Sequence, residues 1–266
     1  MINIIKPHYD ILTPISEGGI EELQKIELAA RTCYKSEDKI SPDGESAKKL
    51  VKALIKSGHE AMLEHGSLSV RFTCDRGVSH ELVRHRIASY AQESSRYCNY
   101  SKDKFGNSIT VIEPCFYDDI SDELKKRLRK YVDNMSANGM DTFASDANKD
   151  PLHLRYASWY HACLIAGENY IFMLECGATP QEARAVLPNS LKTEVVMTAN
   201  YREWRNVFKL RCASDAHPQI RELMIPLCQE LQERIPILFD DCYPLGNSVI
   251  ERDENGKPIA GRYPMK

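Results

Sequence analysis

The chain has 266 residues, of which 42% are hydrophobic and 27% charged, and its formal net charge is −3. This composition excludes a disordered chain, and the mildly acidic charge excludes a generic nucleic-acid binder, which carries a basic excess. No run approaches the roughly 18 apolar residues of a membrane span, and the N-terminus lacks a signal-peptide pattern. Nine cysteines without a CxxC motif predict reduced thiols and a cytoplasmic protein with no membrane partner.

Apolar spacing, alternation and capping residues predict the secondary structure in chain order. The predicted elements are a helix after Gly19, a helix ending before Gly58, a strand at 68–72, a helix at 78–90, a strand at 110–112, a helix after Ser121, helices at 151–177 and 180–187, a strand at 191–198, and helices at 201–210 and 217–234. We expect a helix-rich α/β (α+β) fold: a single domain over residues 1–250 with a central, mostly antiparallel sheet. A polar tail follows at 251–266.

The common glycine-rich and catalytic signatures are absent. The sequence has no G-x-G-x-x-G, no P-loop, no G-x-S-x-G elbow and no H-E-x-x-H. If the protein binds a nucleotide, side chains rather than a glycine-rich loop must hold it.

Residues 84–97 read RHRIASYAQESSRY, a segment with three arginines, several hydroxyl groups and no lysine. A solvated face usually mixes lysine with arginine, whereas the planar guanidinium fork matches phosphate or a uracil edge. On a regular helix Arg84 and Arg86 would point about 200° apart. Either the helix ends near Arg86, or the two arginines serve different ligands or subunits.

Two further clusters flank this segment. In His59-Glu60 and Glu64-His65 the histidines are six residues apart, which is wrong for one metal on a regular helix, so we expect no metal site. Downstream, a basic and amide-rich set lies on both sides of the predicted strand at 191–198. Arg184 precedes the strand, and the residues that follow it are Asn200, Arg202, Asn206 and Arg211.

Together these motifs resemble the flavin-dependent thymidylate synthases. Arg84-His85-Arg86 followed by seven residues and Ser94 is similar to the family's RHR-x7-S signature. The histidine and glutamate pairs at 59–65 resemble its upstream element, and the downstream set resembles its C-terminal pattern in order and spacing. The resemblance covers roughly residues 18–235.

The resemblance implies methylation of dUMP to dTMP with methylenetetrahydrofolate as carbon donor, NADPH as reductant and bound FAD. It also implies a homotetramer with active sites at subunit junctions. Our own hypothesis is that Arg84 faces the nucleotide and Arg86 the flavin. The implied dUMP contacts are Glu81, Arg84, Gln92, Glu93, Ser94, Ser95, Arg96, Arg184 and Arg211. The implied FAD contacts are Ala61 (through its backbone), Arg84, His85, Arg86, Gln92, Asn200, Tyr201, Arg202 and Asn206, with His59 and His217 as further candidates.

The chemistry must make C5 of uracil nucleophilic, and the resemblance implies that no enzyme cysteine is needed. A guanidinium near N3 and O4 favours the ionised pyrimidine, and Arg211 matches the family residue for that role. Ser94 has no predictable base, so we assign it to substrate positioning. Among the implied dUMP contacts Glu81 is the least expected, because its negative charge would repel a substrate phosphate.

Three alternatives remain open. One is a flavin oxidoreductase, using FAD or FMN, that acts on another small substrate. Another is a metal-dependent hydrolase that uses the histidines at 59, 65, 80 and 85. The third is an RNA-binding module built on the arginine cluster, which would bind with a steep salt dependence.

Overall fold

A computed structural model describes residues 2–134 and 150–242 of the chain. The chain forms two compact units, each assembled from three stretches of sequence. The first unit takes Met1–Lys6, Cys74–Gly77 and Glu93–Thr193, and the second takes Pro7–Thr73, Val78–Gln92 and Glu194–Lys266. The tail expected at 251–266 lies outside the described residues, and the single domain over 1–250 stays a prediction.

A four-stranded sheet with the order β2-β3-β6-β4 forms the centre of the second unit. Its strands are β2 (His8–Ile11), β3 (Ser67–Asp75), β4 (Ala88–Gln92) and β6 (Lys192–Asn200). β2 pairs with β3, and β4 with β6, in antiparallel register, which confirms the expected antiparallel sheet. Along β6, Val195, Met197 and Ala199 are buried and alternate with half-buried residues, as the two-residue period of a strand requires.

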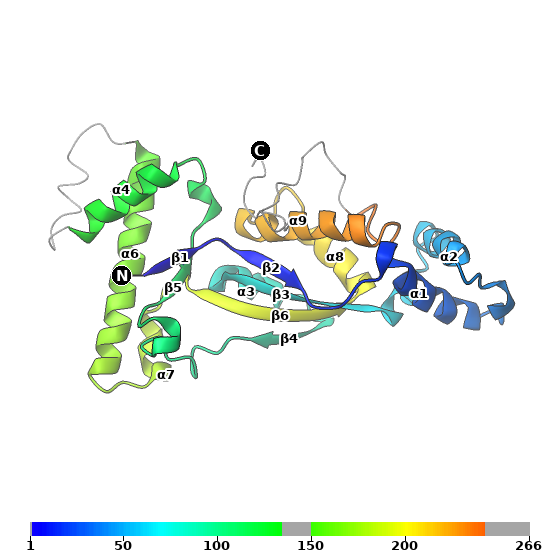
Figure 1. Ribbon diagram of the computed structural model, residues 1–266, viewed down its shortest axis with the longest axis horizontal. Helices are drawn as coiled ribbons and strands as arrows, with labels where there is room; N and C mark the ends of the chain where they lie inside the picture. Colours follow the sequence, from blue (N-terminus) through cyan, green and yellow to red (C-terminus); the bar gives the residue numbers. More distant parts are fainter. Residues whose placement is uncertain (1, 135–149, 243–266) are drawn as a thin grey trace. The chain divides into compact units, whose positions relative to one another are not determined.

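Helices α8 (Tyr201–Arg211) and α9 (Pro218–Arg234) lie along one face of this sheet (Figure 1). Trp204 on α8 is fully buried, donates from Nε1 to Leu68 O at 3.0 Å, and packs 6.3 Å from the Phe72 ring. These contacts seat α8 on β3. The other helices of this unit are η1 (Glu17–Gly19), α1 (Ile20–Thr32), η2 (Glu37–Lys39), α2 (Glu45–Lys56), η3 (Glu60–His65) and most of α3 (Arg76–Leu82).

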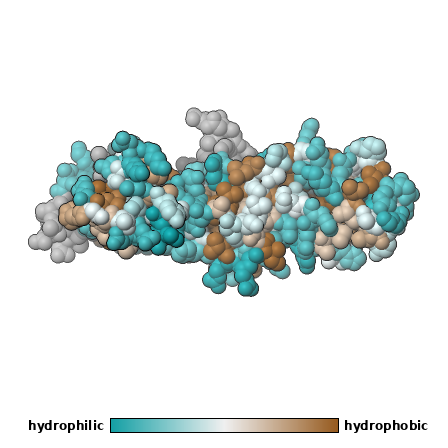
Figure 2. Space-filling model, turned by 90° about the horizontal axis from the view of Figure 1, so that it is seen from below, coloured by the Kyte–Doolittle hydropathy of each residue, from teal (hydrophilic) through white to brown (hydrophobic). Residues whose placement is uncertain are grey.

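The sheet's other face mixes small side chains with charged ones, such as the ion pair of Arg71 on β3 with Asp10 on β2 at 2.9 Å. On β4, Ser89 and Ala91 are exposed. Seen from below, white and brown residues run among the teal ones across the middle of the face (Figure 2).

In the first unit, β1 (Asn3–Ile5) pairs in parallel with β5 (Thr110–Ile112). The helices are η4 (Asp103–Phe105), η5 (Cys115–Tyr117), α4 (Asp122–Asp133), α6 (Pro151–Glu175), α7 (Pro180–Ala183) and η6 (Arg184–Val186). Two apolar clusters form around α6, which buries Tyr156, Tyr160 and Tyr170. Beneath them Glu113 accepts a hydrogen bond from Lys125 Nζ at 2.6 Å, and both side chains are almost fully buried.

Capping residues place most helix starts where the sequence predicts them. Asp150 accepts from Leu152 N at 2.8 Å, with Pro151 at the first helical position. Thr179 and Glu182 form the expected capping box of α7. The helix expected at 78–90 is wrong: α3 ends at Leu82, and residues 88–92 form β4. In the described part of the chain, no helix combines the length and apolar character needed to cross a membrane.

Candidate active site

The turn between α3 and β4 brings the Arg-His-Arg motif out of the helix. The Tyr90 hydroxyl donates to the carbonyl oxygens of Leu82 at 2.7 Å and His85 at 2.8 Å, and so ties the strand back to the end of the helix. Because residues 83–87 are not helical, Arg84 and Arg86 both line one cavity of about 640 Å³. The opposed directions expected for a regular helix therefore do not arise.

We call this space the arginine cavity. Its lining residues are Glu81, Arg84, His85, Arg86, Ile87, Glu203, Asn206, Leu210 and Arg211. They come from α3, the turn after it, and α8, all within the second unit. Six of them belong to the predicted dUMP or FAD contacts, so the fold gathers residues that are more than a hundred positions apart in sequence.

A chain of hydrogen bonds fixes Arg211 in this cavity. Its Nε donates to His85 Nε2 at 3.0 Å, while Nη1 donates to Glu81 Oε2 at 2.8 Å and Nη2 to the Glu81 carbonyl at 3.1 Å. On the other side of the ring, His85 Nδ1 lies 3.2 Å from Glu203 Oε1. The negative charge of Glu81, which was expected to repel a substrate phosphate, is thus compensated by its ion pair with Arg211.

The contacts also define the protonation of His85. Burial, followed by the Arg211 charge, lowers the pKa of His85 below its ordinary value of 6.5, while Glu203 acts in the opposite direction. A guanidinium offers only donors, so Nε2 must accept and the ring proton must sit on Nδ1, facing Glu203. His85 is therefore a neutral ring of one defined tautomer.

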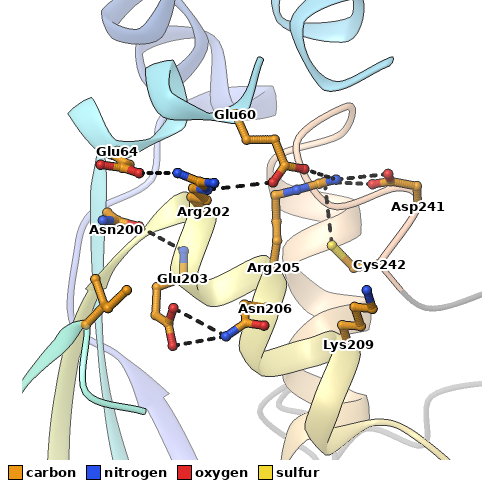
Figure 3. Close-up of a pocket in the computed structure, with 11 residues that line it drawn as sticks. Glu60, Glu64, Asn200, Arg202, Glu203, Arg205, Asn206, Lys209, Asp241 and Cys242 are labelled. Atoms are coloured by element: carbon orange, nitrogen blue, oxygen red, sulfur yellow. Dashed lines mark hydrogen bonds and ion pairs between the residues drawn. The ribbon is translucent and has the colours of Figure 1, made fainter. Parts of the chain in front are cut away.

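A second space, the α8 cavity, has a volume of about 730 Å³. Its lining residues are Glu60, Glu64, Ile87, Asn200, Arg202, Glu203, Arg205, Asn206, Lys209, Asp241 and Cys242. They come mainly from η3, from α8 as far as Lys209, and from the segment after α9 (Figure 3). The predicted FAD residues Asn200, Arg202 and Asn206 meet here.

The arginines of the α8 cavity are held by carboxylates. Arg202 Nη1 donates to Glu64 at 2.7 Å (Figure 3). Arg205 donates to both carboxylate oxygens of Asp241, at 2.6 and 2.9 Å, and its Nη2 lies 3.4 Å from Glu60. The bidentate pair holds the pKa of Asp241 below its ordinary value.

The α8 cavity mixes hydrogen-bond donors with carboxylates. The amides of Asn200 and Asn206 and the Lys209 ammonium can donate to the heterocycle edge and the phosphate oxygens of a dinucleotide. Four carboxylates also line the cavity, and three of them already hold the two guanidinium groups: Glu60, Glu64 and Asp241, with Glu203 as the fourth. A pyrophosphate bound here would compete with these carboxylates for the arginines.

Some predicted FAD residues lie at the border of this region. The Tyr201 ring is buried, its pKa is raised by burial, and a Cβ on Gly66 would come within 2.2 Å of it, so this side chain is structural. Ala61 and the preceding His59 lie at the start of η3. His217 caps α9, where its Nδ1 accepts from the backbone of residue 219 at 3.3 Å.

The remaining predicted dUMP residues are divided between the two units. The first unit contains Glu93, Ser94, Ser95, Arg96 and Arg184. Gln92 belongs to the second unit and donates to Ser79 Oγ at 3.1 Å. Glu93 accepts from Lys192 at 3.0 Å and from Tyr100 at 3.1 Å. The Ser94 hydroxyl accepts from Arg96 N, and no acid or base among the described residues is hydrogen-bonded to it. The roles of these residues toward dUMP stay predictions.

Sequence reasoning missed three contributors: Glu203, Arg205 and Asp241. Arg205 lies between Arg202 and Arg211 in the sequence, and this local density of arginines was the available signal. Glu203 follows three positions after Asn200, whose Oδ1 caps its backbone N–H at 2.8 Å. Nothing in the local pattern linked Glu203 to His85, which lies 118 positions away. No group of three or more His, Cys, Asp or Glu side chains in the described chain could hold a metal ion.

Comparison with known proteins gives consistent matches over most of the chain. The family model Thy1, described as thymidylate synthase complementing protein, matches residues 20–237. A flavin-dependent thymidylate synthase of Corynebacterium aurimucosum is 31% identical over 228 residues, covering 85% of this chain and 82% of the relative. Proteins of the same name from Mycobacterium leprae and Mycobacterium marinum are 35% identical over 219 residues and 34% over 230. The first covers 81% of this chain and 78% of the relative, the second 86% and 82%.

Proposed function

Because the chain belongs to the family of flavin-dependent thymidylate synthases, we propose that it methylates dUMP to dTMP, with methylenetetrahydrofolate as carbon donor and NADPH as reductant through bound FAD. The observation that carries this proposal is the arginine cavity, in which Arg84, Arg86 and Arg211 surround one space. The protein is thus a methyltransferase, and its action in the cytoplasm stays a prediction.

Arg211 supplies the electrostatic activation of uracil. Of the five N–H donors of a guanidinium, three are used by His85 and Glu81, which leaves one on Nη1 and one on Nη2. Both remaining groups are donors, and O4 and the ionised N3 of a pyrimidine are acceptors that can use them. Because the charge is already oriented, stabilising the pyrimidine anion requires little reorganisation.

The flavin would be held in the α8 cavity by Arg202 and the amides of Asn200 and Asn206. When bound, FAD supplies the hydride for reduction of the transferred carbon. The residues of this chain bind it, orient it and exclude water. Glu60 and Glu64 hold Arg202 in place, so its guanidinium is preorganised at the cavity wall.

Cys242, the cysteine that lines the α8 cavity, is a poor nucleophile because burial raises the pKa of its thiol to about 12. Burial, and then the charge of Glu93, raise the pKa of Cys98, so its thiol stays protonated at neutral pH. Cys212 follows Arg211 but is buried. These features support a reaction without an enzyme thiolate.

Ser94→Ala is expected to retain clear turnover, with a raised KM for dUMP, because no base is hydrogen-bonded to the Ser94 hydroxyl. Steady-state kinetics with dUMP as the varied substrate measures both constants. Complete loss of turnover, with dUMP binding intact by calorimetry, would show that Ser94 is a nucleophile.

The function is tested by a visible spectrum of the purified protein followed by an assay of NADPH oxidation with dUMP and methylenetetrahydrofolate. We expect a yellow protein whose NADPH oxidation yields dTMP. A colourless protein that takes up no FAD contradicts the proposal. A yellow protein that forms no dTMP under these conditions favours the oxidoreductase alternative.

We also propose a homotetramer with active sites at subunit junctions. The exposed small residues on β4 and the mixed surface around them support a contact between copies (Figure 2). Light scattering coupled to size exclusion measures the mass directly. A monomer of about the chain mass of 30.3 kDa would exclude sites shared between subunits.

A further inference from the structure

Glu203 is a buried carboxylate that faces both cavities. Its side chain is 8% exposed, and it lines the arginine cavity and the α8 cavity. Oε1 lies 3.2 Å from His85 Nδ1, and Asn206 Nδ2 lies 3.4 Å from each carboxylate oxygen (Figure 3). Among the described residues, neither a lysine nor an arginine forms an ion pair with it. A buried carboxylate is costly unless it is hydrogen-bonded, and the two side chains that contact this one, His85 and Asn206, both line the arginine cavity.

Glu203 is the only described acceptor at the Nδ1 side of His85, and it fixes the position of the ring proton together with Arg211: Arg211 donates to Nε2, and Glu203 accepts from Nδ1–H. With the proton on Nδ1, the Nε2 lone pair faces Arg211 and accepts from its Nε at 3.0 Å. With the proton on Nε2, an N–H would face a guanidinium N–H, and the contact would become repulsive. The orientation of Arg211 is thus linked to a side chain that does not touch it.

We propose that Glu203 is a positioning residue: it keeps the His85 proton on Nδ1, so that Nε2 holds the Arg211 guanidinium in the arginine cavity, and it orients the Asn206 amide toward the α8 cavity. This inference rests on the proposed function, because Arg211 and Asn206 take their roles from it. One carboxylate then aligns the substrate side and the flavin side of the site together.

The first test measures the tautomer itself and needs no activity. In the full-length protein labelled with ¹⁵N-histidine, ring nitrogen shifts report which nitrogen carries the proton, and the spectrum of His85→Gln identifies the signal. We expect a protonated Nδ1 in the parent protein and a mixed or reversed tautomer in Glu203→Ala. A parent His85 protonated on Nε2, or an unchanged tautomer in Glu203→Ala, overturns the proposal.

The second test uses kinetics. Glu203→Ala is expected to lower kcat for dTMP formation on the order of 10–100-fold, as when the outer partner of a functional histidine is removed. Glu203→Gln keeps a carbonyl acceptor for Nδ1–H and is expected to recover most of that loss. Glu21→Gln, an exposed glutamate on α1, is the control and should match the parent. Equal loss in the Gln and Ala variants, with a tautomer that stays on Nδ1 in both, contradicts the proposal.

The pH profile gives an independent signature. The charged and titratable groups that face His85 are Glu203 and Arg211 on α8, Glu81 on α3 through Arg211, and Tyr90 on β4, whose pKa burial raises to about 12. Protonated His85 cannot accept from Arg211, so activity falls as pH drops through the His85 pKa. Because Glu203 raises that pKa, the acid limb should move to lower pH in Glu203→Gln. A limb that stays in place, or moves up, counts against the proposal.

The two failures are distinguishable. If the parent protein forms no dTMP, the proposed function fails, and the ¹⁵N shifts alone then decide whether Glu203 sets the His85 tautomer. If dTMP forms but the tautomer does not respond to Glu203→Ala, the function stands and the positioning role fails. Thermal unfolding of each variant identifies any variant that does not fold. If Glu203→Ala does not fold, the acid limb of the pH profile of Glu203→Gln is compared with that of the parent instead.

Discussion

Arg211→Gln should lower kcat/KM for dUMP by about 10²–10³-fold, the loss typical when a preorganised donor to a developing anion is removed. Glutamine carries no positive charge. The substitution also removes the two guanidinium N–H groups that are not bound by Glu81 or His85. FAD retention should change little, because the α8 cavity is not lined by Arg211. Steady-state kinetics and the flavin absorbance of the purified variant measure both quantities.

Two variants make this result specific. Arg211→Lys keeps the positive charge but loses the planar guanidinium fork. Its kcat/KM for dUMP should therefore also be strongly lowered and only modestly higher than that of Arg211→Gln. Arg127→Gln removes an exposed arginine from α4 and should behave like the parent. Activity in Arg211→Gln within a few-fold of the parent would mean that uracil is activated elsewhere.

The parts of the fold that local chemistry determines were predictable. Asp150 with Pro151, and Thr179 with Glu182, cap their helices in the structure as the sequence indicates. The helix expected at 78–90 failed because its polar residues gave no breaking signal. The helix ends where the Tyr90 hydroxyl binds two carbonyls, and that contact depends on the pairing of β4 with β6. Tertiary structure thus overrides a local helical pattern.

The candidate site was predictable where it follows a motif and hidden where it depends on partners. Arg84, Arg86 and Arg211 could be named from spacing, and they meet in one cavity. The link from Glu203 to His85 spans 118 positions, so no window of sequence contains it. The pairing of Arg205 with Asp241 spans 36 positions and likewise appears only in the fold.

Glu113→Ala should lower the free energy of unfolding by about 3–5 kcal/mol, because it leaves the buried Lys125 ammonium without its anion. In the parent protein Glu113 receives Lys125 at 2.6 Å and Lys6 at 2.9 Å. Urea unfolding followed by circular dichroism measures the change. The exposed Glu123→Ala on the neighbouring helix α4 is the matched control, expected to change stability by less than about 0.5 kcal/mol.

The pH dependence of this difference identifies its electrostatic origin. Burial alone would raise the pKa of Glu113, but the hydrogen bonds from Lys125 and Lys6 outweigh it and leave the pKa below its ordinary value of 4.5. A lowered pKa means that the stabilisation is complete above 4.5 and is lost as the pH falls through the lower, folded-state pKa. The gap between the parent and Glu113→Ala should therefore narrow below pH 4.5. A gap that stays constant down to acid unfolding would assign the loss to the cavity left by the side chain rather than to the ion pair.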